Sequence, residues 1–201
     1  MDDAARPATV RYDEHTALVV VDVQNDFADP AGSLSVPGAG QVIDAVNGEI
    51  EVATGAGAEV VYTQDWHPPR TPHFVTDGGP WPVHCVRGTW GAELHPALDV
   101  IGGFVLKGVG GEDGYSGFTM RAADGTESST GLHELLRRSD VDRVVIVGLA
   151  LDYCVKATAL DAVELGYGCA VVRRATAPVE VHDGDGAAAE AELASAGVSV
   201  I

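Results

Sequence analysis

The sequence has 201 residues, 46% of them hydrophobic, which is enough for a single domain over 1–201 with a sizeable core. Its 12 basic and 30 acidic residues give a formal net charge of −18, so the surface should repel nucleic acid and anionic lipid. Three cysteines and the absence of an apolar leader or long apolar run predict a reduced, cytoplasmic protein. We therefore expect a small-molecule partner, with homo-oligomerisation left open.

The first part of the chain predicts an irregular arm followed by a strand that ends in a carboxylate. Residues 1–16 are polar and aperiodic, which indicates a loosely held N-terminal arm. The apolar run at 17–23 predicts a strand, and Asp22 interrupts it near its carboxyl end. Because an isolated buried charge is costly, this carboxylate should be solvated or paired in a crevice; the alternative is a cap for the next segment. A helix at 40–54 and a strand at 59–64 should follow.

A long segment rich in proline and glycine, residues 65–91, follows this strand and cannot form regular helix or sheet. Asp65 and His67 are two positions apart, so an extended chain places their side chains on one side. His73 and His84 follow at loop distances. This ligand set suits a divalent ion, with Zn²⁺ as the first choice and Fe²⁺ or Mn²⁺ as alternatives, although each histidine taken alone is more often an ordinary polar residue. Four further histidines have no other candidate ligands near them in the sequence and are interpreted as structural: His15, His95, His133 and His182.

The second half alternates strands and helices, which predicts a doubly wound α/β fold with a mainly parallel six-stranded sheet and helices on both faces. Lys107 ends a short apolar strand. Its ammonium group either reaches solvent or pairs with Asp22 across the strand ends. The remaining strands are expected at 104–107, 144–147, 168–172 and 198–201, and the helices at 132–138, 154–165 and 184–196.

Cys154 lies between a buried strand and the start of a helix. Open α/β sheets place ligands at the carboxyl ends of their strands, and a helix N-terminus favours a thiolate. Cys154 is therefore a candidate nucleophile, with a small buried hydrophobic residue as the alternative. Asp22 and Lys107 also lie at strand ends, so the topology can bring the three side chains together.

At this point the chain resembles the isochorismatase-like hydrolases and, within them, the nicotinamidase (pyrazinamidase) family. The matching segments occur in the family's order and span most of the chain: VVVDVQNDF, DWHP, GPWPVHCVRGTWGAELHPAL, the lysine followed by GYSGF, and GLALDYCVKATALDAVELG. The DWH and WPVHC pieces carry metal ligands that the isochorismatases and N-carbamoylsarcosine amidases generally lack. Leu151 departs from the small polar residue that is common in the last motif.

The resemblance implies hydrolysis of nicotinamide to nicotinate and ammonia through a thioester, in NAD salvage, with pyrazinamide as a further substrate. The rivals are another small amide as substrate, or a non-catalytic metal-binding scaffold. The resemblance assigns Cys154 as nucleophile, Asp22 as base and Lys107 as the stabilising cation. It implies an oxyanion hole from the N–H groups of Ala150 and Cys154, behind a cis peptide bond. It also implies metal ligands at Asp65, His67 and His84 with His73 at a variable position, and substrate contacts from Phe27, Trp81 and Tyr115.

Overall fold

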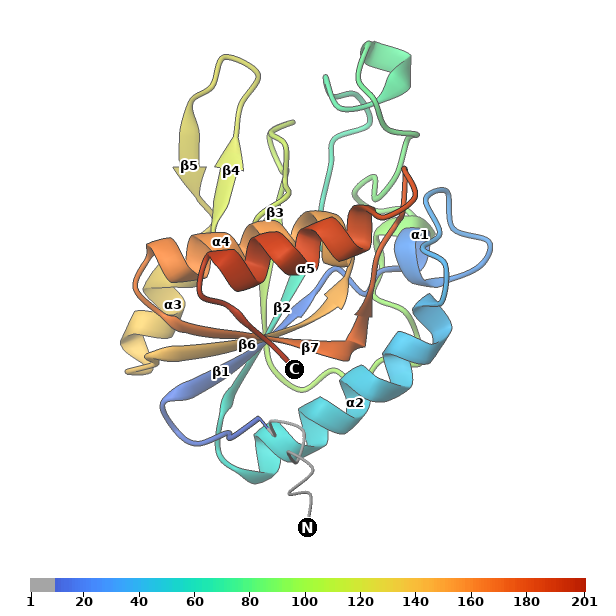
Figure 1. The fold of residues 1–201 in the computed structure, drawn as a ribbon. Coiled ribbons are helices and arrows are strands. Elements are labelled where there is room, and N and C mark those ends of the chain that lie inside the picture. The colour runs from blue at the N-terminus through green and yellow to red at the C-terminus, as the bar shows by residue number, and fades with distance from the viewer. Residues whose placement is uncertain (1–9) are drawn as a thin grey trace.

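The computed structural model describes residues 10–201, which form a central sheet between two helical layers (Figure 1). The sheet has six strands in the order β3-β2-β1-β6-β7-β8, and every neighbouring pair is parallel. The prediction of a doubly wound α/β fold is therefore confirmed. The strands are β1 (Thr16–Val21), β2 (Glu59–Asp65), β3 (Gly103–Lys107), β6 (Arg143–Leu149), β7 (Gly168–Ala177) and β8 (Ser199–Val200).

Helices cover both faces of the sheet because the central strands are apolar on both sides. In β1, Leu18 and Val20 pack into one core and Val19 and Val21 into the other. Strands buried on both faces have continuous apolar sequences rather than alternating apolar and polar residues. The long helix α2 lies on one face, and α4 and α5 lie across the other (Figure 1). The α-helices are α1 (Asn25–Ala28), α2 (Ala39–Gly55), α3 (Leu132–Arg138), α4 (Lys156–Glu164) and α5 (Asp185–Ser195).

A glycine lets β6 approach β1 closely where both strands end. Gly148 has a φ of 107°, and a Cβ atom built there would lie 2.1 Å from the carbonyl oxygen of Val21. The pairing of β6 with β7 also shifts register between Ile146 and Gly148. Any side chain at this position would push the two strand ends apart. The ends that carry Asp22 and the Cys154 turn are thus held together.

The structure differs from the sequence-based expectations at the start of the chain. Thr16 is already the first residue of β1, so the prediction of a loose arm is wrong there, while residues 1–9 lie outside the described residues. Tyr12 also donates a hydrogen bond of 2.6 Å to Glu49. The strand ends at Val21 rather than at 23, because Asp22 has a φ of 49° and turns the backbone away.

A small antiparallel hairpin was not predicted. It consists of β4 (Thr119–Arg121) and β5 (Glu127–Ser129), and it projects beyond the α4 and α5 layer (Figure 1). Its strands are short and mostly exposed, so they lack an alternating apolar pattern. Asp124 and Gly125 in the turn are the one signal that could have indicated it. Within residues 10–201, no helix combines the length and the apolar character needed to cross a membrane.

Candidate active site

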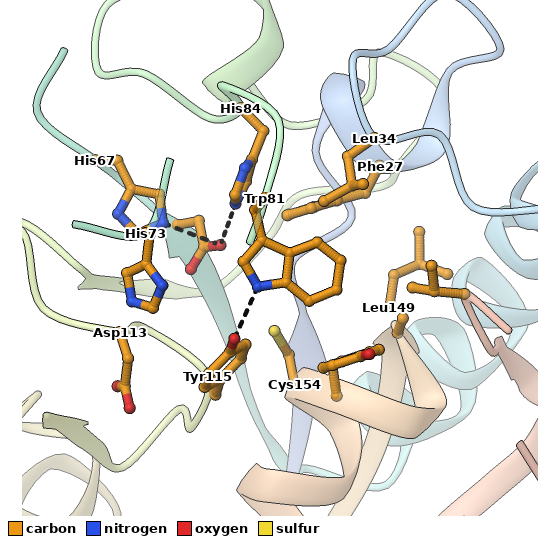
Figure 2. Close-up of a pocket in the computed structure, with 14 residues that line it drawn as sticks. Phe27, Leu34, His67, His73, Trp81, His84, Asp113, Tyr115, Leu149 and Cys154 are labelled. Atoms are coloured by element: carbon orange, nitrogen blue, oxygen red, sulfur yellow. Dashed lines mark hydrogen bonds and ion pairs between the residues drawn. The ribbon is translucent and has the colours of Figure 1, made fainter. Parts of the chain in front are cut away.

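A pocket opens at the carboxyl ends of the sheet strands. Figure 2 shows His67, His73 and His84 gathered on one side of it and Leu34 and Leu149 on the other, with Cys154 near the base. The long segment after β2 supplies the histidines. It is largely irregular, with two short 3₁₀ turns, Val75–Asp77 and Trp90–Ala92. The pocket thus combines a polar end that can hold a metal with an apolar wall.

Lys107 joins the polar groups at the base of the pocket. Its Nζ atom lies 2.6 Å from Oδ2 of Asp22, 2.9 Å from Oδ1 of Asp65 and 3.5 Å from Sγ of Cys154. It also donates a short hydrogen bond to the carbonyl oxygen of Gly114. A single buried cation therefore contacts two carboxylates and the thiol, and it does not reach solvent.

The strand order explains how Lys107 reaches Asp22. β3 and β1 are not neighbours, because β2 lies between them. Asp65 ends β2 and is paired in register with Lys107. Thr63, two residues before it, donates a hydrogen bond of 2.6 Å to Oδ1 of Asp22. The lysine therefore extends over the end of the intervening strand, and the alternative that its ammonium reaches solvent is wrong.

Burial and this cation set the protonation of the cluster. Burial raises the pKa of Asp22 to about 6, against the attraction of Lys107. Burial acts in the same direction on Asp65, but Lys107, His67 and His84 outweigh it and hold that pKa well below its usual value. For Lys107, burial favours the neutral form, yet the two carboxylates raise its pKa well above the usual range. The lysine is thus charged, and Asp22 is the carboxylate that can exchange a proton near neutrality.

Cys154 lies in a widened turn between β6 and α4. Residues Leu151–Val155 form a π-helical turn, so the regular helix begins at Lys156, slightly later than expected. Burial raises the pKa of the Cys154 thiol well above its usual value, while Lys107 opposes this and Asp22 adds to it. The thiol is therefore protonated at rest, and forming the thiolate requires a neighbouring base.

The turn before Cys154 forms part of the pocket wall. The Leu149–Ala150 peptide bond is cis, and Ala150 and Cys154 both line the pocket. The chain departs from the family pattern at Leu151, and that side chain is fully buried in the core beneath the turn.

Asp65, His67 and His84 converge as a candidate metal site. One ligand atom from each lies within 4.8 Å of the others, and all three side chains are buried. Oδ2 of Asp65 is 3.5 Å from Nε2 of His67 and 3.7 Å from Nε2 of His84, too far for good hydrogen bonds. Ligands about 2.1 Å from a tetrahedral ion lie about 3.4 Å apart, so the spacing fits a shared metal. The carbonyl of Pro82 lies 2.7 Å from Nδ1 of His84 and orients the ring so that Nε2 faces the site.

His73 lies beside this group but not within it. Its ring centroid is 5.8 Å from that of His67 and 5.7 Å from that of Tyr115. Burial lowers its pKa, which favours the neutral form that a ligand needs. Cys85, next to His84, packs in the core, where its Sγ lies 3.8 Å from the carbonyl oxygen of Gly91. The four histidines interpreted as structural do not line the pocket: His15, His95, His133 and His182.

Aromatic side chains form much of the remaining wall. Nε1 of Trp81 donates a hydrogen bond of 2.8 Å to the hydroxyl of Tyr115 (Figure 2). Phe27 lies on α1, and its ring centroid is 5.5 Å from that of His84. Tyr153 packs edge-on against Trp81, with ring centroids 4.9 Å apart. Sequence reasoning did not assign five of the lining residues: Leu34, Asp113, Leu149, Tyr153 and Val179. Leu149 and Tyr153 had a local signal, because they belong to the strand end and turn that lead to Cys154.

Comparison with known families agrees with this geometry. The model of the isochorismatase domain matches residues 16–201. This chain belongs to the isochorismatase family. The matched region begins at the first residue of β1 and includes all the sheet strands and pocket residues described above, so the family relationship covers the site as well as the fold.

Individual members of the isochorismatase family are similar over nearly the full chain. The nicotinamidase of Escherichia coli (strain K12) is 36% identical over 202 residues, which cover 92% of this chain and 93% of the relative. The structure of PnC1 from L. infantum in complex with nicotinate has a TM-score of 0.86 and 38% identity, covering 96% of each chain. The pyrazinamidase of Pyrococcus horikoshii in complex with zinc has a TM-score of 0.82 and 38% identity, covering 93% of this chain and 98% of that one.

Proposed function

We propose that this chain is a metal-dependent cysteine amidohydrolase that converts nicotinamide to nicotinate and ammonia, as a cytoplasmic step of NAD salvage. The observation that carries the proposal is the contact of Lys107 with Asp22, Asp65 and Cys154, which joins a thiol and a base to a candidate metal site. Residues 1–201 are taken as a single hydrolase domain. The relatives with nicotinate and zinc in their structures support both the ligand class and the metal.

The pocket suits a flat heteroaromatic amide. Phe27 and Trp81 line it with aromatic surface that can face a pyridine ring, and Tyr115 is held against Trp81 by a hydrogen bond. The ring must present its carboxamide to Cys154 at the base, while its nitrogen faces the histidines. Pyrazinamide has the same shape and a ring nitrogen at the same position, so we expect it to be a second substrate.

In the first half-reaction, Asp22 accepts the proton of the Cys154 thiol, and Lys107 stabilises the negative charge that forms. Sγ attacks the amide carbon and the carbonyl oxygen becomes an oxyanion, which accepts hydrogen bonds from the N–H groups of Ala150 and Cys154. The C–N bond then breaks, and Asp22 returns the proton to the leaving nitrogen. Ammonia departs and a thioester remains on Cys154.

In the second half-reaction, water replaces ammonia. Asp22 removes a proton from this water, and the oxygen attacks the thioester carbon. The same backbone N–H groups stabilise the second oxyanion. The C–S bond breaks, the thiolate recovers the proton from Asp22, and the new carboxyl group loses its remaining proton to solvent as nicotinate leaves. Each half-reaction therefore needs Asp22 unprotonated at its start, which its pKa of about 6 permits near neutrality.

Asp65, His67 and His84 would hold the divalent ion, and zinc fits their one oxygen and two nitrogen ligands. His73 stands at the rim as an additional, weaker contributor. A bound ion would supply a Lewis-acid partner for the pyridine nitrogen, directly or through water. This role orients the substrate, and the attacking nucleophile remains the sulfur of Cys154.

The test is ammonia release by zinc-loaded protein from nicotinamide, pyrazinamide and an aliphatic amide such as butyramide. We expect release from the first two and little from the third. The Cys154→Ala variant should bind zinc but release no ammonia, and Cys169→Ala, which alters a buried cysteine outside the pocket, should remain active. Absence of release from nicotinamide by the wild type would refute the proposed substrate. Substantial activity of Cys154→Ala would refute the covalent mechanism.

A further inference from the structure

Three consecutive polar residues that the mechanism does not use are buried beside the pocket. Gln24, Asn25 and Asp26 have exposed fractions of 0%, 2% and 8%. They lie between Asp22, the proposed base, and Phe27, which lines the pocket wall. Burying polar groups is unfavourable unless each finds a hydrogen-bond partner, so their partners indicate what they hold in place.

Gln24 holds the backbone of Asp65 from both sides. Its Oε1 accepts a hydrogen bond of 2.8 Å from the N–H of Asp65, and its Nε2 donates one of 2.8 Å to the carbonyl oxygen of the same residue. Nε2 also donates to the carbonyl oxygen of Ala92 at 2.8 Å. The side-chain amide thus acts as a short strand partner for Asp65 and ties it to the end of the irregular segment.

Asp26 holds the segment that carries His84. Its Oδ2 accepts a hydrogen bond of 2.7 Å from the N–H of Cys85, the residue that follows His84. Its Oδ1 accepts one of 3.0 Å from the N–H of Ser33, beside the lining residue Leu34. Asn25, between Gln24 and Asp26 in the sequence, donates a hydrogen bond of 2.8 Å from Nδ2 to the carbonyl oxygen of Trp90. Each residue of the run therefore fixes a different part of the loops around the pocket.

The fold explains why side chains perform this task. The backbone ladder between β1 and β2 stops when Asp22 turns into a left-handed conformation, while Asp65 and the histidine segment extend beyond it. Few regular backbone pairs remain there to fix the chain; one is an isolated bridge between His67 and Val86. Side-chain amide and carboxylate groups can replace backbone partners, because they present the same donors and acceptors.

We propose that Gln24 and Asp26 are positioning residues for the metal site, with Gln24 fixing the Asp65 ligand and Asp26 fixing the His84 ligand. The inference rests on the metal site assigned under the proposed function. Groups that orient metal ligands typically contribute about 10- to 100-fold to metal affinity. Gln24 acts on the backbone of the ligand Asp65, and Asp26 acts on the backbone of Cys85, the residue after the ligand His84. Neither bonds a ligand side chain, so both should affect affinity without changing the ligand set.

The test measures zinc affinity of metal-free protein by competition with a chromophoric chelator, together with thermal unfolding. Gln24→Met keeps the side-chain length but removes the three hydrogen bonds of the amide, and should weaken zinc binding about 10- to 100-fold. Asp26→Asn keeps the size but replaces one acceptor with a donor, and should weaken it about 10-fold. The matched control is Asn47→Leu, because Asn47 makes the same two-sided contact with the backbone of residues 97 and 99, outside the pocket.

The control separates positioning from general loss of stability. We expect Asn47→Leu to bind zinc as the wild type does. A folded Gln24→Met protein with wild-type zinc affinity would overturn the proposal, as would equal losses of affinity in all three variants. If Gln24→Met does not fold, the zinc affinity of Asp26→Asn is the deciding measurement. A wild-type zinc affinity in Asp26→Asn then overturns the proposal. A wild-type protein that binds no zinc would overturn the metal site itself and this inference with it. If the wild type binds zinc and the variants keep the same affinity, only the positioning role of Gln24 and Asp26 is overturned.

Discussion

The ammonium nitrogen of Lys107 and Oδ2 of Asp22 lie 2.6 Å apart, with both side chains fully shielded from solvent. Such a pair is stable only while both charges are present, because either one alone is costly to bury. Asp65 adds a second negative charge 2.9 Å from the same nitrogen. The lysine therefore has a structural function as well as the proposed catalytic one.

Replacing Lys107 by Met should destabilise the fold and abolish activity. It leaves Asp22 and Asp65 buried without their cation, and breaking a buried pair in this way costs about 3–5 kcal/mol. Urea unfolding measures the loss. Lys156→Met is the matched control, since Lys156 pairs with the more exposed Glu192, and it should cost at most about 1 kcal/mol. Equal stability of the two variants would contradict this account of the cluster.

The rate of nicotinamide hydrolysis should fall in acid. Burial raises the pKa of Asp22 to about 6, so below that pH the carboxyl group is protonated and cannot accept the thiol proton. We expect kcat/KM to decrease about tenfold per pH unit below about pH 6 and to be level just above it. Initial rates at low substrate concentration across this range, with zinc content monitored, provide the measurement. A profile that stays level below this pH would remove Asp22 from the role of base.

Thr63→Val should move this acid limb to higher pH. The Thr63 hydroxyl donates a 2.6 Å hydrogen bond to Asp22 and so lowers its pKa. Valine has nearly the same shape but no donor, and therefore the carboxylate loses one stabilising contact. The same pH series compares the variant with the wild type. A limb that shifts to lower pH would contradict the direction of this effect.

Trp81→Phe and Tyr115→Phe should weaken substrate binding by similar amounts. Each removes the 2.8 Å hydrogen bond that fixes the two rings, which is worth about 1 kcal/mol or about fivefold in KM. The double variant should be little worse than either single one, because both changes remove the same contact. The Michaelis constants for nicotinamide of the wild type, the two single variants and the double variant provide the measurement. Full additivity would show that the two rings act independently.

His67→Ala and His73→Ala should differ in zinc content. His67 belongs to the three converging ligands, whereas His73 stands outside that group. We expect His67→Ala to lose stoichiometric zinc, and His73→Ala to retain it with lower affinity. Elemental analysis after dialysis gives the metal content, and added zinc should raise the melting temperature of His73→Ala more than that of His67→Ala. The reverse order would exchange the roles of the two histidines.

The sequence predicted those parts of the site that depend on local patterns. Apolar runs located the sheet strands, and Asp22, Lys107 and Cys154 could be placed at strand ends because each interrupts or follows such a run. The side-by-side arrangement of these ends could not be read from the chain, since the order of the strands is a long-range property. That is why the position of β2 between Lys107 and Asp22 emerged only from the structure.

Other features escaped prediction because their partners are remote in sequence. Leu34 and Val179 enter the pocket from separate loops, and neither has a distinctive neighbour in the chain. The contact of Gln24 with Asp65 spans 41 positions. A buried glutamine signals only that it has a partner, and the fold decides which one.

The strand order also determines when the reactive centre can exist. The carboxylates and the lysine are all on β1, β2 and β3 or directly after them, within residues 16–107. The thiol enters later, when β6 docks on the open side of β1. During synthesis from the N-terminus, the chain therefore cannot bring the thiol to the base and the lysine until β6 and the turn after it have joined the first three strands. Before that point Cys154 is an ordinary thiol without the neighbouring base and cation, so the proposed hydrolysis is a late result of folding.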